Sequence, residues 1–266
     1  MEQPMQKQMP KQKQTFLGTL AIAATTLLAA CSGGGGGDGD GGGTAATTIN
    51  PADLKGRWAT PKEATTAMTA IIIPDAGTAN VWLLANDSSR LVKLMVRGDD
   101  SSSNGKSYAL SADGRAAGDG QPVVGKATLT ATPKSVSFTG VNATVLALNQ
   151  SDALAGPAVQ ADVAGSWDVS MSGGSRKVQW SLDAAGAIAS TDSSSTTGCT
   201  YTGTLTAMTD AGAYKAQFSE ACPDTGGTKT VNFSGIATIN PEKSRLTVIA
   251  TSADDARGAA LLFKKK

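Results

Sequence analysis

Short stretches in which apolar and polar side chains alternate recur from about residue 51 to the end of the chain. Gly, Asp and Ser separate these stretches, and those residues favour turns. Because the side chains of a strand point alternately to its two faces, the spacing predicts a meandering antiparallel sheet. The second half is expected to hold about eight strands, which contain residues 167–171, 177–182, 188–190, 201–206, 214–218, 231–233, 246–249 and 260–263.

Few signals point to other local structure after residue 50. No stretch keeps the 3.6-residue period of a helix for three turns, although residues 63–70 fit a short helix. Asn104-Gly105 and Asp113-Gly114 are dipeptides of the hairpin type, and we expect a turn at each.

The strand pattern occurs twice. Gly56-Arg57-Trp58 returns as Gly165-Ser166-Trp167, and Ile71 to Gly77 aligns with Trp180 to Gly186 at the same offset. The repetition predicts two divergent copies of one module.

The modules are expected at residues 51–155 and 163–266, and the fold class is all-β, with two tandem small antiparallel meander barrels or sandwiches. So small a barrel fills its interior with its own side chains, which weighs against a roomy ligand cavity. We therefore expect Trp58 and Trp167 to be structural core residues.

The first thirty residues have the layout of an export signal. Lysines precede an apolar stretch at residues 16–30, which is shorter than a membrane-spanning helix requires. The stretch ends in Leu28-Ala29-Ala30-Cys31, which resembles the lipobox of bacterial lipoproteins. This resemblance implies cleavage before Cys31, lipidation of that cysteine, and anchoring to a membrane through the attached lipid.

Residues 31–50 follow as a flexible, glycine-rich tether. Asp38 and Asp40 in this tether look like the start of a calcium loop, but the other ligands of such a loop are missing. Ser32 after the lipidated cysteine, by resemblance to other lipoproteins, fits an outer-membrane location, at the periplasmic face or the cell surface.

Composition narrows the function classes. The chain has 23 basic and 22 acidic residues and no histidine. Removal of residues 1–30 takes away three lysines and one glutamate, so the formal charge falls from +1 to −1 (20 basic against 21 acidic residues). No basic surface for nucleic acid is expected. The missing histidines exclude His-dependent triads and most zinc sites, and we expect neither a metal nor a cofactor. The final three lysines are expected to be a solubilising end.

Three further motifs were weighed. Cys199 and Cys222 form an even pair once Cys31 is lipidated, so a disulfide is expected between the strand that starts near Cys199 and the turn after Phe218. Asp224-Thr225-Gly226 matches the aspartic-protease triplet, but no second copy exists, and a hairpin turn is the better interpretation. The stretch 103–106 fits Ser-x-x-Lys without the companion motifs. No enzyme is therefore predicted.

Two resemblances bear on the fold. Gly-x-Trp at the start of each module resembles the opening strand of lipocalin-type and avidin-type barrels, in which an Arg near the last strand packs on the Trp; Arg257 is the candidate for Trp167. The stretch 198–204, with Tyr214, Cys222 and 235–237, resembles a β-rich module of proteobacterial, Burkholderia-type lipoproteins of uncharacterised function. That resemblance implies fold and location only.

Two functions remain open. The first is an envelope lipoprotein that acts as a non-catalytic interaction or structural module and binds an envelope or host protein or a glycan. The alternative, suggested by the lipocalin-like and avidin-like features, is a carrier of a small apolar ligand. An apolar cavity of roughly 300 Å³ or more would favour the carrier.

Overall fold

The computed structural model describes residues 48–116, 118–141, 145–171, 176–190 and 197–266. The expected signal segment, Cys31 and residues 31–47 of the expected tether, with Asp38 and Asp40, lie outside these residues. The last three tether residues are described, and Ile49 among them is buried in the first barrel, where its amide donates to the carbonyl of Gly98 at 3.0 Å. The described residues belong to one compact unit, Thr44–Lys266. No helix within the described ranges is long and apolar enough to span a membrane.

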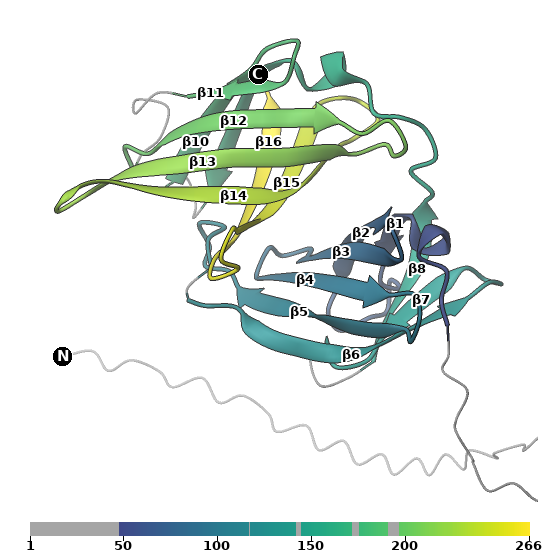
Figure 1. Cartoon of the computed structure of the whole chain (residues 1–266). Coiled ribbons are helices and arrows are strands. Elements are labelled where there is room, and N and C mark those ends of the chain that lie inside the picture. Colours follow the sequence, from purple (N-terminus) through teal and green to yellow (C-terminus); the bar gives the residue numbers. More distant parts are fainter. Residues whose placement is uncertain (1–47, 117, 142–144, 172–175, 191–196) are drawn as a thin grey trace, which may run out of the picture. The chain divides into compact units, whose positions relative to one another are not determined.

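The first half of this unit is a closed antiparallel barrel. Each strand pairs with the next along the chain, and the last strand pairs with the first. A short 3₁₀ helix precedes the barrel (Figure 1). The elements are η1 (Pro51–Leu54), β1 (Gly56–Ala59), β2 (Met68–Asp75), β3 (Thr78–Ala85), β4 (Arg90–Arg97), β5 (Ser102–Ala109), β6 (Gln121–Thr130), β7 (Ser135–Phe138) and β8 (Leu146–Asp152).

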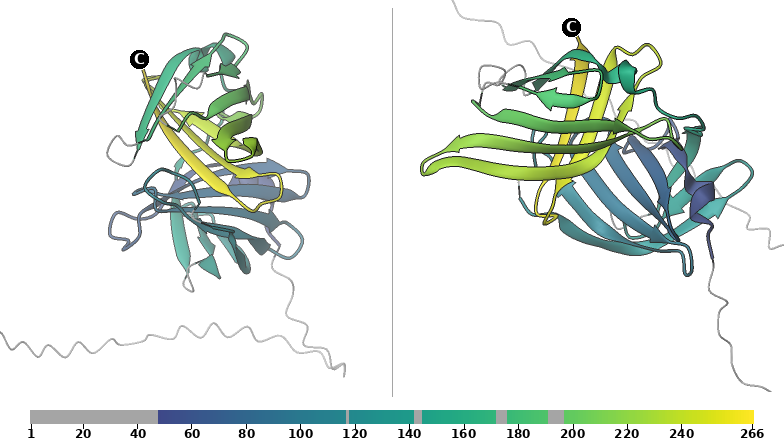
Figure 2. Two further views of the ribbon diagram at one scale, coloured as in Figure 1. Left: turned by 90° about the vertical axis from the view of Figure 1, so that its left-hand side faces the viewer. Right: turned by 45° about the horizontal axis from the view of Figure 1, so that its top comes forward.

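The second half repeats this arrangement. Its eight strands form a second closed barrel, in which β16 pairs with β9, and the β13–β14 hairpin extends beyond the neighbouring strands (Figures 1 and 2). The elements are η3 (Gln160–Val163), β9 (Gly165–Met171), β10 (Arg176–Leu182), β11 (Ala187–Ala189), β12 (Thr200–Ala207), β13 (Tyr214–Asp224), β14 (Gly227–Ile239), β15 (Arg245–Ser252) and β16 (Gly258–Lys265). The expected all-β fold is confirmed, and both modules are barrels.

Both barrels open in the same way. A 3₁₀ turn leads into a glycine with positive φ, Gly56 or Gly165, and the Trp two residues later is fully buried. The indole Nε1 of Trp58 donates to the carbonyl of Leu54 at 2.8 Å, and that of Trp167 donates to the carbonyl of Val163 at 2.7 Å. Each Trp therefore ties the start of its barrel to the preceding turn, as expected of a core residue.

The barrel interiors are filled by side chains. Every strand of the second barrel contributes to one buried cluster that is rich in aromatic residues. Trp180 lies within this cluster, with ring centres 5.1 Å from Phe218 and 4.7 Å from Phe263. The buried cluster of the first barrel is mainly aliphatic and contains Trp58 and Phe138. The two copies of the module thus keep one topology with different packing.

The sequence alignment of the second strands is wrong by one residue. In the first barrel Ile72 pairs with Gly56, and in the second Leu182 pairs with Gly165. Trp180 therefore corresponds to the inward-facing Ala70 and not to Ile71, which belongs to a different buried cluster. The connection from the first to the second strand is one residue longer in the second barrel, because the paired residues Gly165 and Leu182 are 17 positions apart and Gly56 and Ile72 are 16. A shift of one residue in a strand exchanges its two faces.

Three local expectations are corrected. Asn104-Gly105 lies inside β5 and not at a turn, whereas Asp113-Gly114 does lie at a turn. Residues 63–70 form turns and the start of β2 instead of a helix. The lysines at 264–266 do not form a separate tail, because β16 includes two of them and the Lys266 amide donates to the carbonyl of Ser166 at 3.0 Å, although their side chains are exposed.

Candidate functional site at the junction of the barrels

Outward-facing side chains of the two barrels form a third buried cluster, which we call the junction. From the first barrel it includes Ile71, Trp82 and Leu91, and from the second Ile236 and Ile249, all at most 7 % exposed. Side chains that would face water in an isolated barrel are thus buried. Burial of apolar surface on this scale is a strong favourable term and holds the barrels together.

A loop of the first barrel extends the sheet of the second. The amide of Ala116 donates to the carbonyl of Gly258 at 2.9 Å, and the amide of Ala260 donates to the carbonyl of Gly114 at 2.9 Å. These bonds use the edge of β16 before it pairs with β9 at Lys264 and Lys265. The loop therefore satisfies backbone groups that an open edge would expose.

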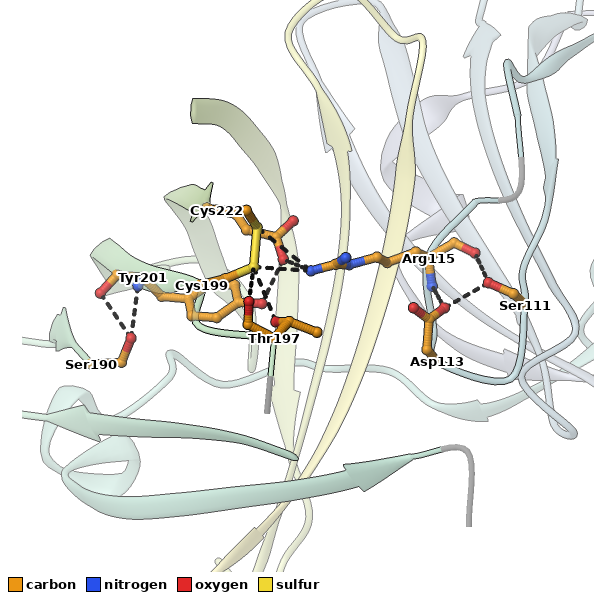
Figure 3. Close-up of polar contacts among 9 residues, drawn as sticks. Ser111, Asp113, Arg115, Ser190, Thr197, Cys199, Tyr201 and Cys222 are labelled. Atoms are coloured by element: carbon orange, nitrogen blue, oxygen red, sulfur yellow. Dashed lines mark hydrogen bonds and ion pairs between the residues drawn. A yellow bond between two sulfur atoms is a disulfide. The ribbon is translucent and has the colours of Figure 1, made fainter. Parts of the chain in front are cut away.

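This loop carries Arg115 into the second barrel (Figure 3). Its Nη2 contacts Oε1 of Glu220 and lies 3.5 Å from Sγ of Cys199. The hydroxyl of Tyr201 donates to the same Glu220 oxygen at 2.6 Å. Glu220 is 8 % exposed, so its carboxylate depends on these partners for stabilisation. Burial lowers the pKa of Arg115, but Glu220 and Tyr201 together raise it, so the guanidinium stays charged.

The expected disulfide between Cys199 and Cys222 is present. Cys199 immediately precedes β12, as expected, but Cys222 lies within β13, where it pairs with Lys229, and not in a turn. Cys199, Glu220 and Cys222 are the one group of potential metal ligands found among the described residues. While the sulfurs are joined they are not thiolates and cannot bind a metal strongly, and Arg115 already occupies the carboxylate.

A turn of the second barrel is held by the first. Lys93 contacts a carboxylate oxygen of Asp255 at 3.0 Å, and both the Lys106 ammonium and the Tyr108 hydroxyl donate to the Asp255 carbonyl. Burial alone would raise the pKa of Asp255, but hydrogen bonds from Lys93 and Thr251 and nearby lysine charges lower it overall. Burial, followed by the charges of Asp255 and Asp254, raises the pKa of Tyr108.

A depression of about 440 Å³ lies beside the Arg115 cluster. We call it the junction depression. Both barrels line it, and its wall combines ionised side chains of both signs with apolar ones. The charged lining residues are Arg115, Asp119, Glu220, Asp224, Lys229 and Arg257, and the apolar ones include Pro223, Val231 and Phe233.

The candidate catalytic groups are already hydrogen-bonded, lie in a turn or face apart. Glu220 is neutralised by Arg115 and Tyr201, and the chain has no histidine to act as a base. Asp224 ends β13 in the expected hairpin. The Ser103 side chain is buried on one face of β5. The Lys106 side chain lies on the opposite face and donates to the Asp255 carbonyl. These two residues therefore cannot form a Ser-x-x-Lys pair.

A lysine ammonium group lies over each of the two opening tryptophans, and Arg257, the residue expected to pack on Trp167, is not the one that does so. The Lys134 ammonium lies 5.7 Å from the ring centre of Trp58, and that of Lys265 lies 5.2 Å from the ring centre of Trp167. Arg257 follows the turn before β16 and lines the junction depression instead. The tryptophans are buried in the barrels and do not line that depression.

Arg115 and Glu220 were not predicted from the sequence, although the strand pattern around Glu220 could have identified that residue. Tyr214, Ala216, Phe218 and Glu220 alternate along β13 and are all buried. A carboxylate at an inward position of such a strand requires a partner. The partner, Arg115, lies 105 residues earlier in a loop, where no local pattern identifies it.

Comparisons with protein-family models, with curated proteins and with solved structures found no match to this chain.

Proposed function

We propose that this chain is a membrane-anchored envelope lipoprotein that acts as a non-catalytic interaction module. Its partner would be a protein or a glycan of the envelope or of a host. The filled barrel interiors support this function over a carrier with its ligand inside a barrel. No resident cofactor or metal forms part of the proposal.

The junction depression is the observation that carries the proposal. It is open to solvent, is lined by residues of both barrels, and presents positively charged, negatively charged and apolar side chains. Protein and glycan surfaces are recognised by such mixed polar and apolar contacts. Because Arg115 and the disulfide fix the wall before any partner arrives, binding there would cost little ordering entropy.

Anchoring is the second part of the proposal. The Leu28–Cys31 string, the short apolar stretch before it and the glycine-rich tether support a lipid on Cys31 and an outer-membrane location, at the periplasmic face or the cell surface. Metabolic labelling with a radioactive fatty acid tests it. The natural chain should be labelled and sediment with membranes, whereas Cys31→Ser should be unlabelled. A natural chain without label would overturn the anchor.

Site-dependent capture tests the interaction function. The immobilised natural chain is exposed to envelope extract, and the retained species are compared with those retained by a chain carrying Lys229→Ala and Arg257→Ala, two exposed positions in the junction depression. The matched control carries Lys62→Ala and Lys126→Ala, which remove the same charge at exposed sites elsewhere. We expect a protein or glycan that the control retains and the depression variant loses. Equal retention by all three chains would contradict the proposed surface.

A further inference from the structure

A second hollow, of about 350 Å³, lies between outer faces of the two barrels. We call it the arginine groove. Its walls come from β1, β2 and β3 on one side and from β14, β15 and β16 on the other, and it shares no lining residue with the junction depression. Ile71, Leu84, Ile249 and Leu262 line it, and Leu262 is 39 % exposed. The groove therefore exposes apolar surface at the edge of the junction.

The charged lining of this groove is cationic only. Arg57 and Arg245 line it, and no lining residue is acidic. Within the described parts of the chain, no ion pair joins either arginine to a carboxylate. Two carboxylates lie next to lining residues. Asp152 on β8 is the cross-strand partner of Arg57, and its carboxylate accepts from the Leu154 amide at 2.8 Å. Glu242 accepts from the Asn240 side chain at 2.6 Å.

Neutral polar groups complete the lining. Thr69, Thr238 and Thr247 supply hydroxyl groups, and Asn86 adds an amide whose oxygen accepts from Thr69 at 3.0 Å. Hydroxyl and amide groups can donate to an anionic oxygen beside the arginines. The lining of the groove thus combines apolar side chains with two guanidinium groups and further hydrogen-bond donors.

We propose that the arginine groove binds a single-chain amphiphile with a carboxylate head group. The guanidinium groups suit a carboxylate, which accepts two parallel hydrogen bonds from an arginine. The isoleucine and leucine side chains suit an alkyl chain, and burial of that chain adds affinity with each methylene. The volume is at the lower end for ligand sites, which fits one chain of medium length better than a two-chain lipid.

This site goes beyond the proposed interaction at the junction depression. It needs neither the same residues nor a protein partner. It also differs from a lipocalin-like carrier, because the ligand lies outside the barrels. The two proposals can therefore fail separately.

Calorimetric titration with dodecanoate, below its micelle concentration, tests the site. The unit Thr44–Lys266 is used because it contains both closed barrels and their cores, which are the requirements for independent folding. We expect saturable binding of one dodecanoate per chain. Dodecyltrimethylammonium, which has the same alkyl chain and a cationic head, should not bind saturably.

Variants locate the binding. Arg57→Gln with Arg245→Gln should weaken binding roughly tenfold, the combined effect of two partly exposed charge contacts. Leu262→Asp should weaken it at least as much, because it places a charged carboxylate against the apolar alkyl chain. The control, Arg90→Gln with Lys126→Gln, should bind as the natural chain does. Circular dichroism checks that each variant folds.

Three results would overturn the site. The first is unchanged affinity in the folded double arginine variant. The second is equal binding of the anionic and cationic amphiphiles. The third is binding to anionic phospholipid vesicles without binding to free dodecanoate, which would identify a membrane surface as the ligand.

Discussion

At the scale of single residues, Arg115 connects the two barrels most directly. Its Nη2 contacts a buried carboxylate and lies within 3.8 Å of both disulfide sulfurs, although the residue belongs to a loop of the other barrel. Its Nε is buried, and no hydrogen-bond partner for it is found among the described residues. The side chain thus gives up hydration in order to stabilise Glu220, and its removal would leave that charge with Tyr201 as its known neutral partner.

Arg115→Gln should therefore lower the free energy of unfolding. We expect a loss of about 1–3 kcal/mol, less than for a fully buried pair because the Arg115 side chain is 32 % exposed. Arg97→Gln is the matched control, since Arg97 pairs with Asp99 at the surface, and its loss of stability should be clearly smaller. Urea unfolding measures both. Equal losses would mean that the contact with Glu220 adds no stability.

The raised pKa of Tyr108 should make the folded protein less stable in alkaline solution. Burial, with the charges of Asp255 and Asp254, raises its pKa above the value of about 10 of an unfolded tyrosine. The folded chain then holds the phenol proton more tightly, so this contribution is complete below pH 10 and is lost as the pH rises above it. Burial, with the charge of Asp162, likewise raises the pKa of Tyr214, to about 12.

In Tyr108→Phe, stability should fall less steeply with pH. Above pH 10 the slopes of unfolding free energy should differ by up to about 1.4 kcal/mol per pH unit, the effect of one proton. Urea midpoints at several pH values between 8 and 11 measure the slopes. Parallel slopes for the natural chain and the variant would show that Tyr108 does not titrate with a raised pKa. Tyr214→Phe, tested in the same way, extends the comparison to the second barrel.

At the scale of elements, the opening motif is shared but differs in its surroundings. Gly56 has a φ of +149°, and a Cβ there would lie 2.6 Å from the Asp152 carbonyl oxygen. Gly165 has a φ of +124°, and a Cβ there would lie 3.1 Å from Cε of Lys265, the flexible end of a long side chain. The two glycines thus share a conformational constraint and differ in steric crowding.

Gly56→Ala should therefore destabilise the protein more than Gly165→Ala. We expect about 1–2 kcal/mol for Gly165→Ala from the backbone conformation alone, and roughly 1–2 kcal/mol more for Gly56→Ala from the backbone clash. Chemical denaturation of the two variants side by side provides the comparison. The reverse order would mean that Lys265 cannot move away from the new methyl group.

Most elements could be predicted from the sequence. Alternate residues of each strand point into a barrel and are apolar, and this produces the period of two that marks a strand. The eight strands expected in the second module are confirmed. Asn104-Gly105 misled because β5 continues through it, paired with β4 on one side and β6 on the other. The shift between Ile71 and Trp180 could not be seen, because both are apolar and only strand pairing distinguishes their faces.

At the scale of the whole unit, the sequence contains a signal for the junction, which is hard to see among the alternating apolar and polar residues of the other strands. Residues 70–73 and 81–85 are continuous apolar runs, as are 248–250 and 259–262. Such runs are typical of strands that are buried on both faces. In a barrel one face is inside, so the other must meet a partner, and here the other barrel supplies it. The residues that contact each other across this surface are far apart in the sequence, so their pairing could not be predicted from the sequence.

The junction also determines what the molecule presents to others. The loop carrying Arg115 closes an edge of the second barrel, and the turn at Asp255 is held by Lys93 and Lys106 of the first. Two hollows remain open where the barrels meet, the junction depression and the arginine groove. Both hollows are lined by residues of the two barrels together, so the proposed interaction function belongs to the pair of barrels and not to either one.

Photo-crosslinking in the native envelope tests this claim most directly. A benzoylphenylalanine placed at Lys229 or Arg257 lies in the junction depression, whereas one at Lys62 or Lys126 lies on exposed surface elsewhere. We expect a discrete crosslinked partner from positions 229 and 257 and none from 62 and 126. Crosslinks that form only at positions 62 and 126 would show that the partner binds another surface, and the junction depression would then not be the binding site.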